Sequence, residues 1–204
     1  MVSRNYIFWE VDVQRDFVLP GGHLYVPGAE KLLPNVDRLV DAARRGKVLL
    51  ISSGDFHSPQ DPEFRSFPPH CIKGEPGSEL VAQALASNVA RIENTPEAKL
   101  PDNLSQYQQI LLEKQTLDVF QSLHADELVR KLGDGAEFVV FGVVTEFCVN
   151  CAVKGLLERG RRVAVVVDAI ETLKQEDGTA TLKEWQRLGA RVTTTEQALT
   201  DLEG

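Results

Sequence analysis

Residues 142–151 contain two of the three cysteines of the chain, Cys148 and Cys151. An apolar strand pattern ends in this segment and a helical pattern begins, so Cys148 would lie near a helix N-terminus. The helix dipole and free N–H groups there favour a thiolate, and the same N–H groups could hold an oxyanion. The alternative is a buried cysteine that only packs. That alternative is our interpretation of Cys151, which lies deeper in the helix.

Two further charged residues, Asp12 and Lys114, follow apolar runs and would lie at strand ends. A carboxylate there can act as a base or an acid when its neighbours tune its pKa, although Asp also caps turns. A lysine beside a cysteine would lower the thiol pKa, whereas a lysine after a strand is usually a solvated surface charge. Glu10 should face the same side of the strand as Asp12, and should pair with a basic side chain or line the site.

A long segment rich in Pro and Gly, residues 54–77, contains a set of possible metal ligands. Asp55 and His57 are two residues apart and would point the same way in an extended segment. Together with His70 they form a set of two histidines and one carboxylate that leaves positions open for water or substrate. We do not expect Cys71 to join them, because its neighbour His70 would then have to share the ion in a tight bend. The alternative is that these histidines are solvated loop residues.

The remaining histidines and the cysteine count suggest no further chemistry. His23 in a Gly-rich turn and His124 ahead of a helix are expected to be solvated. Three cysteines fit a reducing compartment without a disulfide framework. On one helix, the Cβ atoms of Cys148 and Cys151 would be roughly 5–6 Å apart, whereas a disulfide needs about 3.5–4.5 Å. We therefore expect no bridge between them.

The elements that must position these residues follow from apolar patterning. Runs that are apolar throughout indicate strands covered on both faces, as in parallel sheets, and helical patterns alternate with them. This order predicts right-handed crossovers and a three-layer α/β/α fold with functional residues at the carboxyl ends of the strands. The expected strands are 6–11, 47–52, 109–112, 138–144, 162–167 and 191–195. The expected helices are 29–45, with Pro34 in the first turn, 78–86, 125–132, 149–159 and 179–188.

Bulk composition narrows the classes of partner. A chain of 204 residues that is 43% hydrophobic can bury one sizeable core, so we expect a single domain over residues 1–204. A formal net charge of −8 argues against nucleic acid or an anionic membrane surface as the main binding partner, since both bind basic patches. No apolar run could span a bilayer, and residues 1–5 lack the apolar core of a signal peptide. The expected location is the cytoplasm.

Taken together, these residues resemble the isochorismatase-like cysteine hydrolases, and within them the nicotinamidases. The Asp-x-Gln-x-Asp-Phe motif that begins at Asp12, the lysine at Lys114 and the Gly-Val-x-Thr-Glu-Phe-Cys-Val motif around Cys148 match in order and spacing. The Asp-x-His motif at Asp55 and the Pro-x-His-Cys-x-x-Gly motif around His70 match the metal segment of nicotinamidases. The resemblance covers nearly the whole chain, and the combination of motifs carries it.

The resemblance implies a parallel six-stranded sheet with helices on both faces and a homo-oligomer. It implies a cis peptide bond before Val144 that aims an N–H at the site, and an oxyanion held by the N–H groups of Val144 and Cys148. Phe17, Phe67 and Val144 are expected to contact the substrate. The chain departs from the family pattern in a short segment between the histidines of the metal set, in Phe67 where tryptophan is frequent, in residues 115–120 and in Glu10. These departures touch the substrate pocket rather than the triad.

The resulting hypothesis is a hydrolase of small carboxamides, nicotinamide first among them, that works through a thioester on Cys148. Asp12 would move the proton, Lys114 would favour the thiolate, and one divalent ion on Asp55, His57 and His70 would hold the substrate. Zinc is the first choice of ion, with iron and manganese as alternatives. The competing hypotheses are another amidase of the same superfamily, an inactive relative with a changed pocket, and a non-catalytic nucleotide or flavin module. The last lacks both a Gly-x-Gly-x-x-Gly motif and a P-loop.

Overall fold

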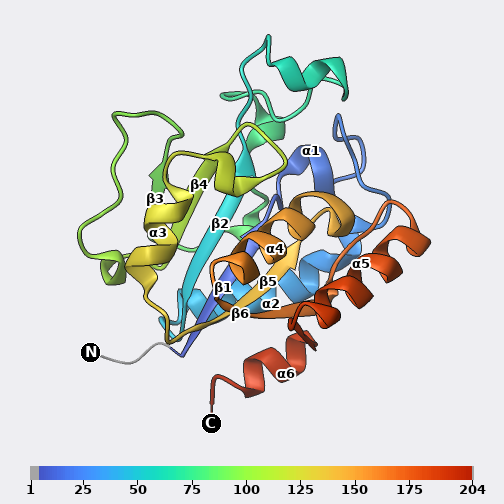
Figure 1. The fold of residues 1–204 in the computed structure, drawn as a ribbon. Coiled ribbons are helices and arrows are strands. Elements are labelled where there is room, and N and C mark those ends of the chain that lie inside the picture. The colour runs from blue at the N-terminus through green and yellow to red at the C-terminus, as the bar shows by residue number, and fades with distance from the viewer. Residues whose placement is uncertain (1–4, 204) are drawn as a thin grey trace.

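The structure, a computed structural model, describes residues 5–203 (Figure 1). Residues 1–4, most of the segment judged above to lack a signal-peptide core, and residue 204 lie outside this range. None of the helices within it combines the length and apolar character needed to cross a membrane. The chain forms one seven-stranded sheet in which every pairing is parallel. The strands are β1 (Tyr6–Val11), β2 (Leu49–Asp55), β3 (Val89–Ile92), β4 (Gln109–Lys114), β5 (Glu137–Gly142), β6 (Arg162–Ile170) and β7 (Arg191–Thr193).

The order of the strands, β3-β4-β2-β1-β5-β6-β7, places β1 at the centre. The chain builds outward from β1 on one side through β2, then crosses to the other side with β5. Ligands in open parallel sheets gather at such a switch of direction, outside the carboxyl ends of the strands. Gly142 at the end of β5 lets the two central strands meet, since a Cβ there would lie 2.0 Å from the carbonyl oxygen of Val11.

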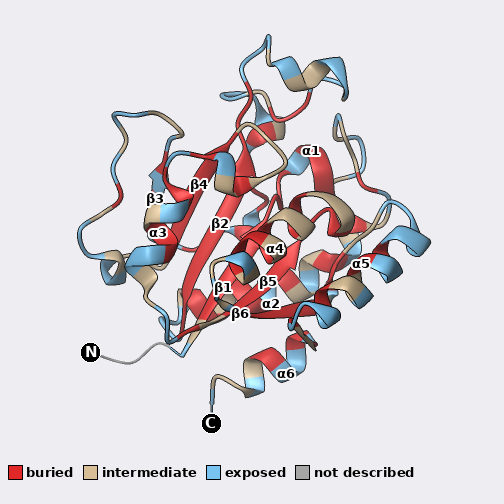
Figure 2. Ribbon diagram, in the orientation of Figure 1, coloured by how far each residue is buried: buried red, intermediate tan, exposed pale blue. Residues whose placement is uncertain are grey.

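Helices cover both faces of the sheet and give three layers (Figure 1). One face packs on α2 and α6 through residues such as Leu39 and Ala198, and the other packs on α3, α4 and α5 through Leu128, Val153 and Trp185. The strands are buried along most of their length, as expected for a sheet covered on both sides (Figure 2). The helices are α1 (Arg15–Val18), α2 (Leu33–Arg44), α3 (Ala125–Leu132), α4 (Asn150–Glu158), α5 (Gln175–Arg187) and α6 (Thr195–Thr200).

The α/β/α class is confirmed, with three differences in detail. The sheet has seven strands rather than six, because the short edge strand β3 was missed. The expected helix 78–86 is wrong: this stretch contains the end of the 3₁₀ turn Pro76–Ser78 and the short 3₁₀ turn Ala82–Ala84, with no α-helix. The expected helix 149–159 is preceded by a π-helical turn, Thr145–Val149, which contains Cys148. Helix α2 begins with Pro34 in its first turn, as expected.

The polar loop contacts of residues 78–86 explain the lost helix. The N–H of Val81 donates to the carbonyl of Val13, 3.1 Å away. The guanidinium of Arg44 donates to the carbonyls of Ala82 and Gln83, and Gln109 donates to that of Ala84. Backbone groups that an isolated helix would pair internally are bound to other parts of the fold, so tertiary hydrogen bonds override the helical pattern.

Candidate active site

Four chain segments that end adjacent strands bring the candidate catalytic residues together. Asp12 directly follows β1, Asp55 and Lys114 end β2 and β4, and Cys148 lies in the π-helical turn after β5. All four side chains are buried, with at most 5% of each residue exposed. Asp12 has φ 52°, in the left-handed region that asparagine and aspartate tolerate best. Residues from four separate parts of the sequence thus meet at the switch point of the sheet.

The ammonium group of Lys114 is the centre of this cluster. Its Nζ lies 2.9 Å from Oδ2 of Asp12, 2.6 Å from Oδ1 of Asp55 and 3.7 Å from Sγ of Cys148. Burial alone would lower the pKa of Lys114, but the two carboxylates outweigh it and raise this pKa well above its ordinary value. Lys114 is therefore a fixed cation that holds two carboxylates beside the sulfur, and the solvated alternative is wrong because its side chain is only 1% exposed.

Asp12 and Cys148 both hold a proton more tightly than they would in water. Burial raises the pKa of Asp12 to about 7, although Lys114 works against this shift. Burial and the nearby charge of Asp12 raise the pKa of the Cys148 thiol well above its ordinary value. The predicted position near a helix N-terminus favours a thiolate, whereas in the structure the desolvation of the sulfur and the charge of Asp12 outweigh the ammonium group. A thiol beside a carboxylate with a pKa near neutrality is a donor–base pair for proton transfer.

Two polar residues of the first motif fix the positions of other site residues. The side-chain amide of Gln14 accepts a hydrogen bond from the N–H of Asp55, at 2.7 Å, and donates to the carbonyl of Asp55, at 2.6 Å. The carboxylate of Asp16 accepts from the N–H of Cys71, at 2.7 Å, next to His70 in the chain. Gly77 packs so closely on Asp16 that a Cβ would lie 2.2 Å from its Oδ2. The first motif thus holds both parts of the metal segment in place, the part around Asp55 through Gln14 and the part around His70 through Asp16.

Asp55, His57 and His70 offer ligand atoms that all lie within 4.8 Å of one another, and all three residues are buried. Nδ1 of His70 lies 2.7 Å from the carbonyl of Pro68; since a carbonyl only accepts, the proton belongs on Nδ1 and Nε2 keeps its lone pair. Nδ1 of His57 lies 3.1 Å from Oδ2 of Asp61, whereas its Nε2 has no hydrogen-bond partner among the described residues. Burial lowers the pKa of His57, but the carboxylates of Asp55 and Asp61 raise it. A buried ring nitrogen without a hydrogen-bond partner, in a negative environment, fits a bound cation.

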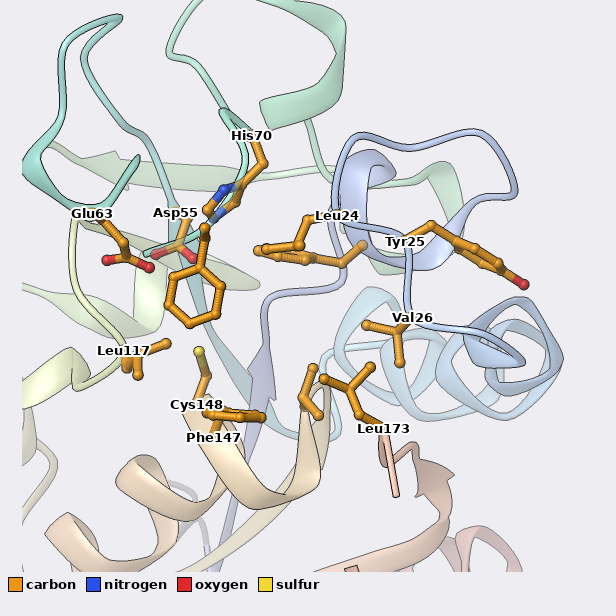
Figure 3. A pocket seen from close by; sticks show the side chains of 13 residues that line it. Leu24, Tyr25, Val26, Asp55, Glu63, His70, Leu117, Phe147, Cys148 and Leu173 are labelled. Atoms are coloured by element: carbon orange, nitrogen blue, oxygen red, sulfur yellow. The ribbon is translucent and has the colours of Figure 1, made fainter. Parts of the chain in front are cut away.

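A small pocket of about 80 Å³ opens onto Cys148 and onto two residues of the metal set, Asp55 and His70 (Figure 3). His70, Asp55 and Glu63 lie on one side, with Leu117 near Glu63, and the aliphatic side chains of Val26 and Leu173 lie on the other. Tyr25 lines the pocket but turns its hydroxyl away, toward Glu30. The expected substrate contacts, Phe17, Phe67 and Val144, all line this pocket. Its complete lining is Phe17, Leu24, Tyr25, Val26, Asp55, Glu63, Phe67, His70, Leu117, Val144, Phe147, Cys148 and Leu173.

The peptide bond between Val143 and Val144 is cis, as the resemblance implied. Among the hydrogen bonds of residues 5–203 outside the helices and strands, none uses the N–H of Val144. An N–H without a protein acceptor at the edge of the pocket is suited to bind a developing oxyanion.

Sequence reasoning missed two acidic residues of the metal segment. Glu63 lines the pocket, and burial together with the charge of Asp55 raises its pKa. Oδ2 of Asp61 lies 3.1 Å from Nδ1 of His57, while its Oδ1 accepts from the N–H of Glu63 at the start of the 3₁₀ turn Pro62–Arg65. The sequence signal was the Asp-Pro-Glu triplet, in which Asp caps the turn that carries Glu63.

Five other sequence expectations have clear outcomes. His23 is exposed, as expected, but His124 is buried and its Nε2 lies 2.9 Å from the carbonyl of Thr95. Cys151 is half-buried rather than buried, and lines an open groove outside the pocket. Glu10 is buried, has no ion pair with a basic side chain among the described residues and does not line the pocket; Oγ of Ser52 donates to it. The three cysteines are free, so Cys148 and Cys151 are not bridged.

The model of the isochorismatase domain matches residues 10–92 and 83–197. The chain belongs to the isochorismatase family. The nicotinamidase of Escherichia coli K12 is 24% identical over 206 residues, which covers 90% of this chain and 92% of that protein. A protein of Arabidopsis thaliana named as a probable inactive nicotinamidase is 25% identical over 94% of this chain and 93% of its own. The pyrazinamidase of Pyrococcus horikoshii in complex with zinc superposes with a TM-score of 0.74 at 25% identity, covering 93% of this chain and 99% of that one.

Proposed function

We propose that this isochorismatase-family hydrolase is a cysteine-dependent amidohydrolase that converts a small carboxamide, nicotinamide first among them, to the acid and ammonia. The observation that carries the proposal is the position of Lys114 Nζ, which contacts both the base candidate Asp12 and the nucleophile candidate Cys148, and Cys148 lines the pocket. The relatives named nicotinamidase and pyrazinamidase support the choice of substrate class.

The proposed reaction uses residues already in contact. The carboxylate of Asp12 takes the thiol proton as Sγ of Cys148 attacks the amide carbon, and the N–H groups of Val144 and Cys148 hold the oxyanion. Asp12 then gives the proton to the leaving nitrogen, so ammonia departs and a thioester remains. In the second half, Asp12 takes a proton from water, the hydroxide attacks the thioester, and the proton returns to sulfur. Lys114 stays charged and stabilises the ionised states of both partners.

Asp55, His57 and His70 are the residues that would hold one divalent ion, with zinc as the first candidate and iron or manganese as alternatives. Such an ion would supply a Lewis-acidic contact for the ring nitrogen of a pyridine carboxamide. Because Cys148 supplies the nucleophile, the three ligands and Glu63 serve to bind and orient the substrate. The zinc complex of the Pyrococcus horikoshii pyrazinamidase supports this choice of ion.

The test is ammonia release from nicotinamide by the purified protein, beside a Cys148→Ala variant and a Cys151→Ala control. We expect turnover by the wild type and the control, and none above background by Cys148→Ala. Turnover that survives in Cys148→Ala would remove the nucleophile assignment.

A second candidate, hydrolysis of a different small amide, is favoured by the apolar lining of the pocket and by Phe67 at a position where tryptophan is frequent in nicotinamidases. A panel of amides with turnover elsewhere and none on nicotinamide would move the assignment to it. No turnover at all, with metal bound, would favour an inactive relative, and a co-purifying chromophore would favour a binding module. A homo-oligomer and a cytoplasmic location remain parts of the proposal, to be tested by sedimentation and by fractionation.

A further inference from the structure

Leu173 is an apolar, solvent-exposed side chain at the edge of the pocket. It is 50% exposed, although it lines the same cavity as Cys148. In Figure 3 it lies beside Val26, on the side of the pocket opposite Glu63. An exposed leucine alone needs no explanation. This one forms part of the aliphatic end of a pocket whose other end is polar, so a bound molecule would cover it.

The backbone that carries Leu173 is fixed by one carboxylate. Glu146 accepts hydrogen bonds from the N–H groups of Leu173, at 2.9 Å, and Lys174, at 3.3 Å, and from Oγ1 of Thr172, at 2.7 Å. These groups directly precede α5, whose first turn has no side-chain cap of its own. The carboxylate therefore satisfies N–H groups at the start of a helix, where negative charge is favourable.

Glu146 also connects this loop to the nucleophile. It lies two residues before Cys148 in the π-helical turn Thr145–Val149. Its neighbour Thr145 donates to the carbonyl of Glu171 through both its N–H, at 2.8 Å, and its hydroxyl, at 2.7 Å. Five hydrogen bonds thus join the turn that carries the sulfur to the loop that carries Leu173. The two segments are far apart in sequence, so these hydrogen bonds, rather than chain connectivity, set the position of Leu173 relative to Sγ of Cys148.

We propose that Leu173, positioned by Glu146, is a specificity-determining residue that selects primary carboxamides whose acyl group carries an apolar substituent. The proposal rests on the amide hydrolysis inferred above. With the carbonyl carbon at Sγ of Cys148, a substituent directed away from the metal set reaches the aliphatic end formed by Leu173, Val26 and Leu24. The contact gains free energy because it removes apolar surface from water on both sides.

The first experiment compares Leu173→Ala with the wild type on acetamide, butanamide and hexanamide. We expect KM to fall with chain length in the wild type, and Leu173→Ala to raise the hexanamide-to-acetamide KM ratio about fivefold by removing half-exposed apolar contact area. Leu188→Ala is the matched control, since Leu188 is 45% exposed just beyond the other end of α5. An unchanged ratio in Leu173→Ala, or an equal change in Leu188→Ala, would overturn the proposal.

The second experiment tests the positioning role of Glu146. Glu146→Gln keeps an oxygen for the two N–H groups and a donor for the hydroxyl of Thr172, so it should keep the wild-type ratio. Glu146→Ala loses these bonds and should reproduce the change in ratio seen in Leu173→Ala. The double variant should add nothing further, because both changes remove the same contact. An equal loss on all three amides would show a general structural role for Glu146 and contradict the positioning role.

A binding measurement separates this proposal from the proposed reaction. Aliphatic aldehydes add to a thiol as thiohemiacetals without hydrolysis, so acetaldehyde and hexanal report on the pocket even when no amide is turned over. We expect hexanal to bind more tightly than acetaldehyde, and Leu173→Ala to reduce that preference about fivefold. If no amide is turned over but the preference for hexanal is intact, the proposed amide hydrolysis is contradicted and the role of Leu173 in selectivity stands. If amides are turned over but hexanal is not preferred, only the role of Leu173 is contradicted.

Discussion

Two buried carboxylates, Glu10 in β1 and Asp12 just beyond it, lie two residues apart and are both fully buried, yet their surroundings differ. Asp12 has the ammonium group of Lys114 2.9 Å away, and its pKa is raised only to about 7. Glu10 instead accepts one hydrogen bond, from the hydroxyl of Ser52 to its Oε2, and its Oε1 has no hydrogen-bond partner among the described residues. Burial raises the pKa of Glu10 well above its ordinary value. A fixed counter-charge is what makes one of the two able to exchange a proton near neutral pH.

The surroundings of Glu10 are a polar network inside the sheet rather than a site. Ser52 donates to Glu10 and accepts from Nε2 of Gln109, which also donates to the carbonyl of Ala84. The network links β1, β2 and β4 to the turn Ala82–Ala84 on the face covered by α2. No pocket opens onto Glu10 among the cavities described, whereas Asp12 adjoins the sulfur that faces one. Access to a ligand is the second difference between the two carboxylates.

Removing the counter-charge should have the largest effect. Lys114→Met leaves two buried carboxylates, Asp12 and Asp55, without their cation. We expect turnover to fall about 10²–10³-fold and stability to fall by about 3–5 kcal/mol. Ammonia release and chemical denaturation measure the two effects. Lys154→Met is the control, since its surface ion pair with Glu184 should contribute about 0–1 kcal/mol. If Lys114→Met were stable and active, the counter-charge would not be what distinguishes Asp12 from Glu10, and the comparison would fail.

Sequence patterning predicted the site far better than it predicted the environment of each residue. Asp12, Lys114 and Cys148 could be grouped because each follows a predicted strand, and the carboxyl ends of parallel strands share one edge of the sheet. A lysine after a strand still looked like a surface charge, because its burial depends on carboxylates from two other strands. The same limit applies to Cys148, whose position near a helix start suggested a thiolate. Its pKa is decided by desolvation and by Asp12, which sequence spacing does not reveal.

The fold shows the same division between local and non-local causes. The central strands could be predicted from runs that are apolar throughout. The edge strand β3, with sequence Val-Ala-Arg-Ile, has four residues and an exposed arginine, so its pattern was too short and too polar. Residues 78–86 carry a helical apolar spacing, but Val13, Arg44 and Gln109 bind their backbone groups. These partners are distant in sequence, so local patterning could not have found them.

Removing the charge of Asp12 should separate function from stability. Asp12→Asn should reduce turnover about 10²–10⁴-fold, because the proton acceptor is lost. In the wild type, kcat/KM should rise with pH through about 7, since Asp12 must be ionised to accept the proton. A raised native pKa means that stability is lost as pH rises from about 4 to about 7. Asp12→Asn should therefore melt no lower than the wild type at pH 8, the opposite of Lys114→Met, and a much lower melting temperature would contradict the assignment.

Removing a metal ligand should affect one class of substrate. His70→Ala should weaken zinc affinity by more than about 10-fold, measured by calorimetry on the metal-free protein. It should raise KM for nicotinamide more than for benzamide, because only the former has a ring nitrogen for the ion. His124→Ala is the control, a buried histidine that contacts the carbonyl of Thr95 instead. Equal losses on both amides would remove the ion from substrate binding, and unchanged zinc affinity would remove His70 from the ligand set.

The smallest effect on activity should come from Glu10. A raised native pKa means that protonated Glu10 contributes stability below about pH 4.5, and that this contribution is lost as pH rises toward the native pKa. Glu10→Gln carries no charge, so its stability should lack this dependence. The two proteins should melt alike near pH 4, and the variant should be more stable by about 1 kcal/mol at pH 8.

Turnover of Glu10→Gln should stay within twofold of the wild type, about 0.4 kcal/mol, since Glu10 has no contact with the pocket. Glu158→Gln, at the exposed C-terminal end of α4, controls for the loss of one negative charge. A variant whose melting temperature follows the wild type at every pH would mean that Glu10 is ionised in the fold. The Glu10 site would then need a counter-charge, as the Asp12 site does.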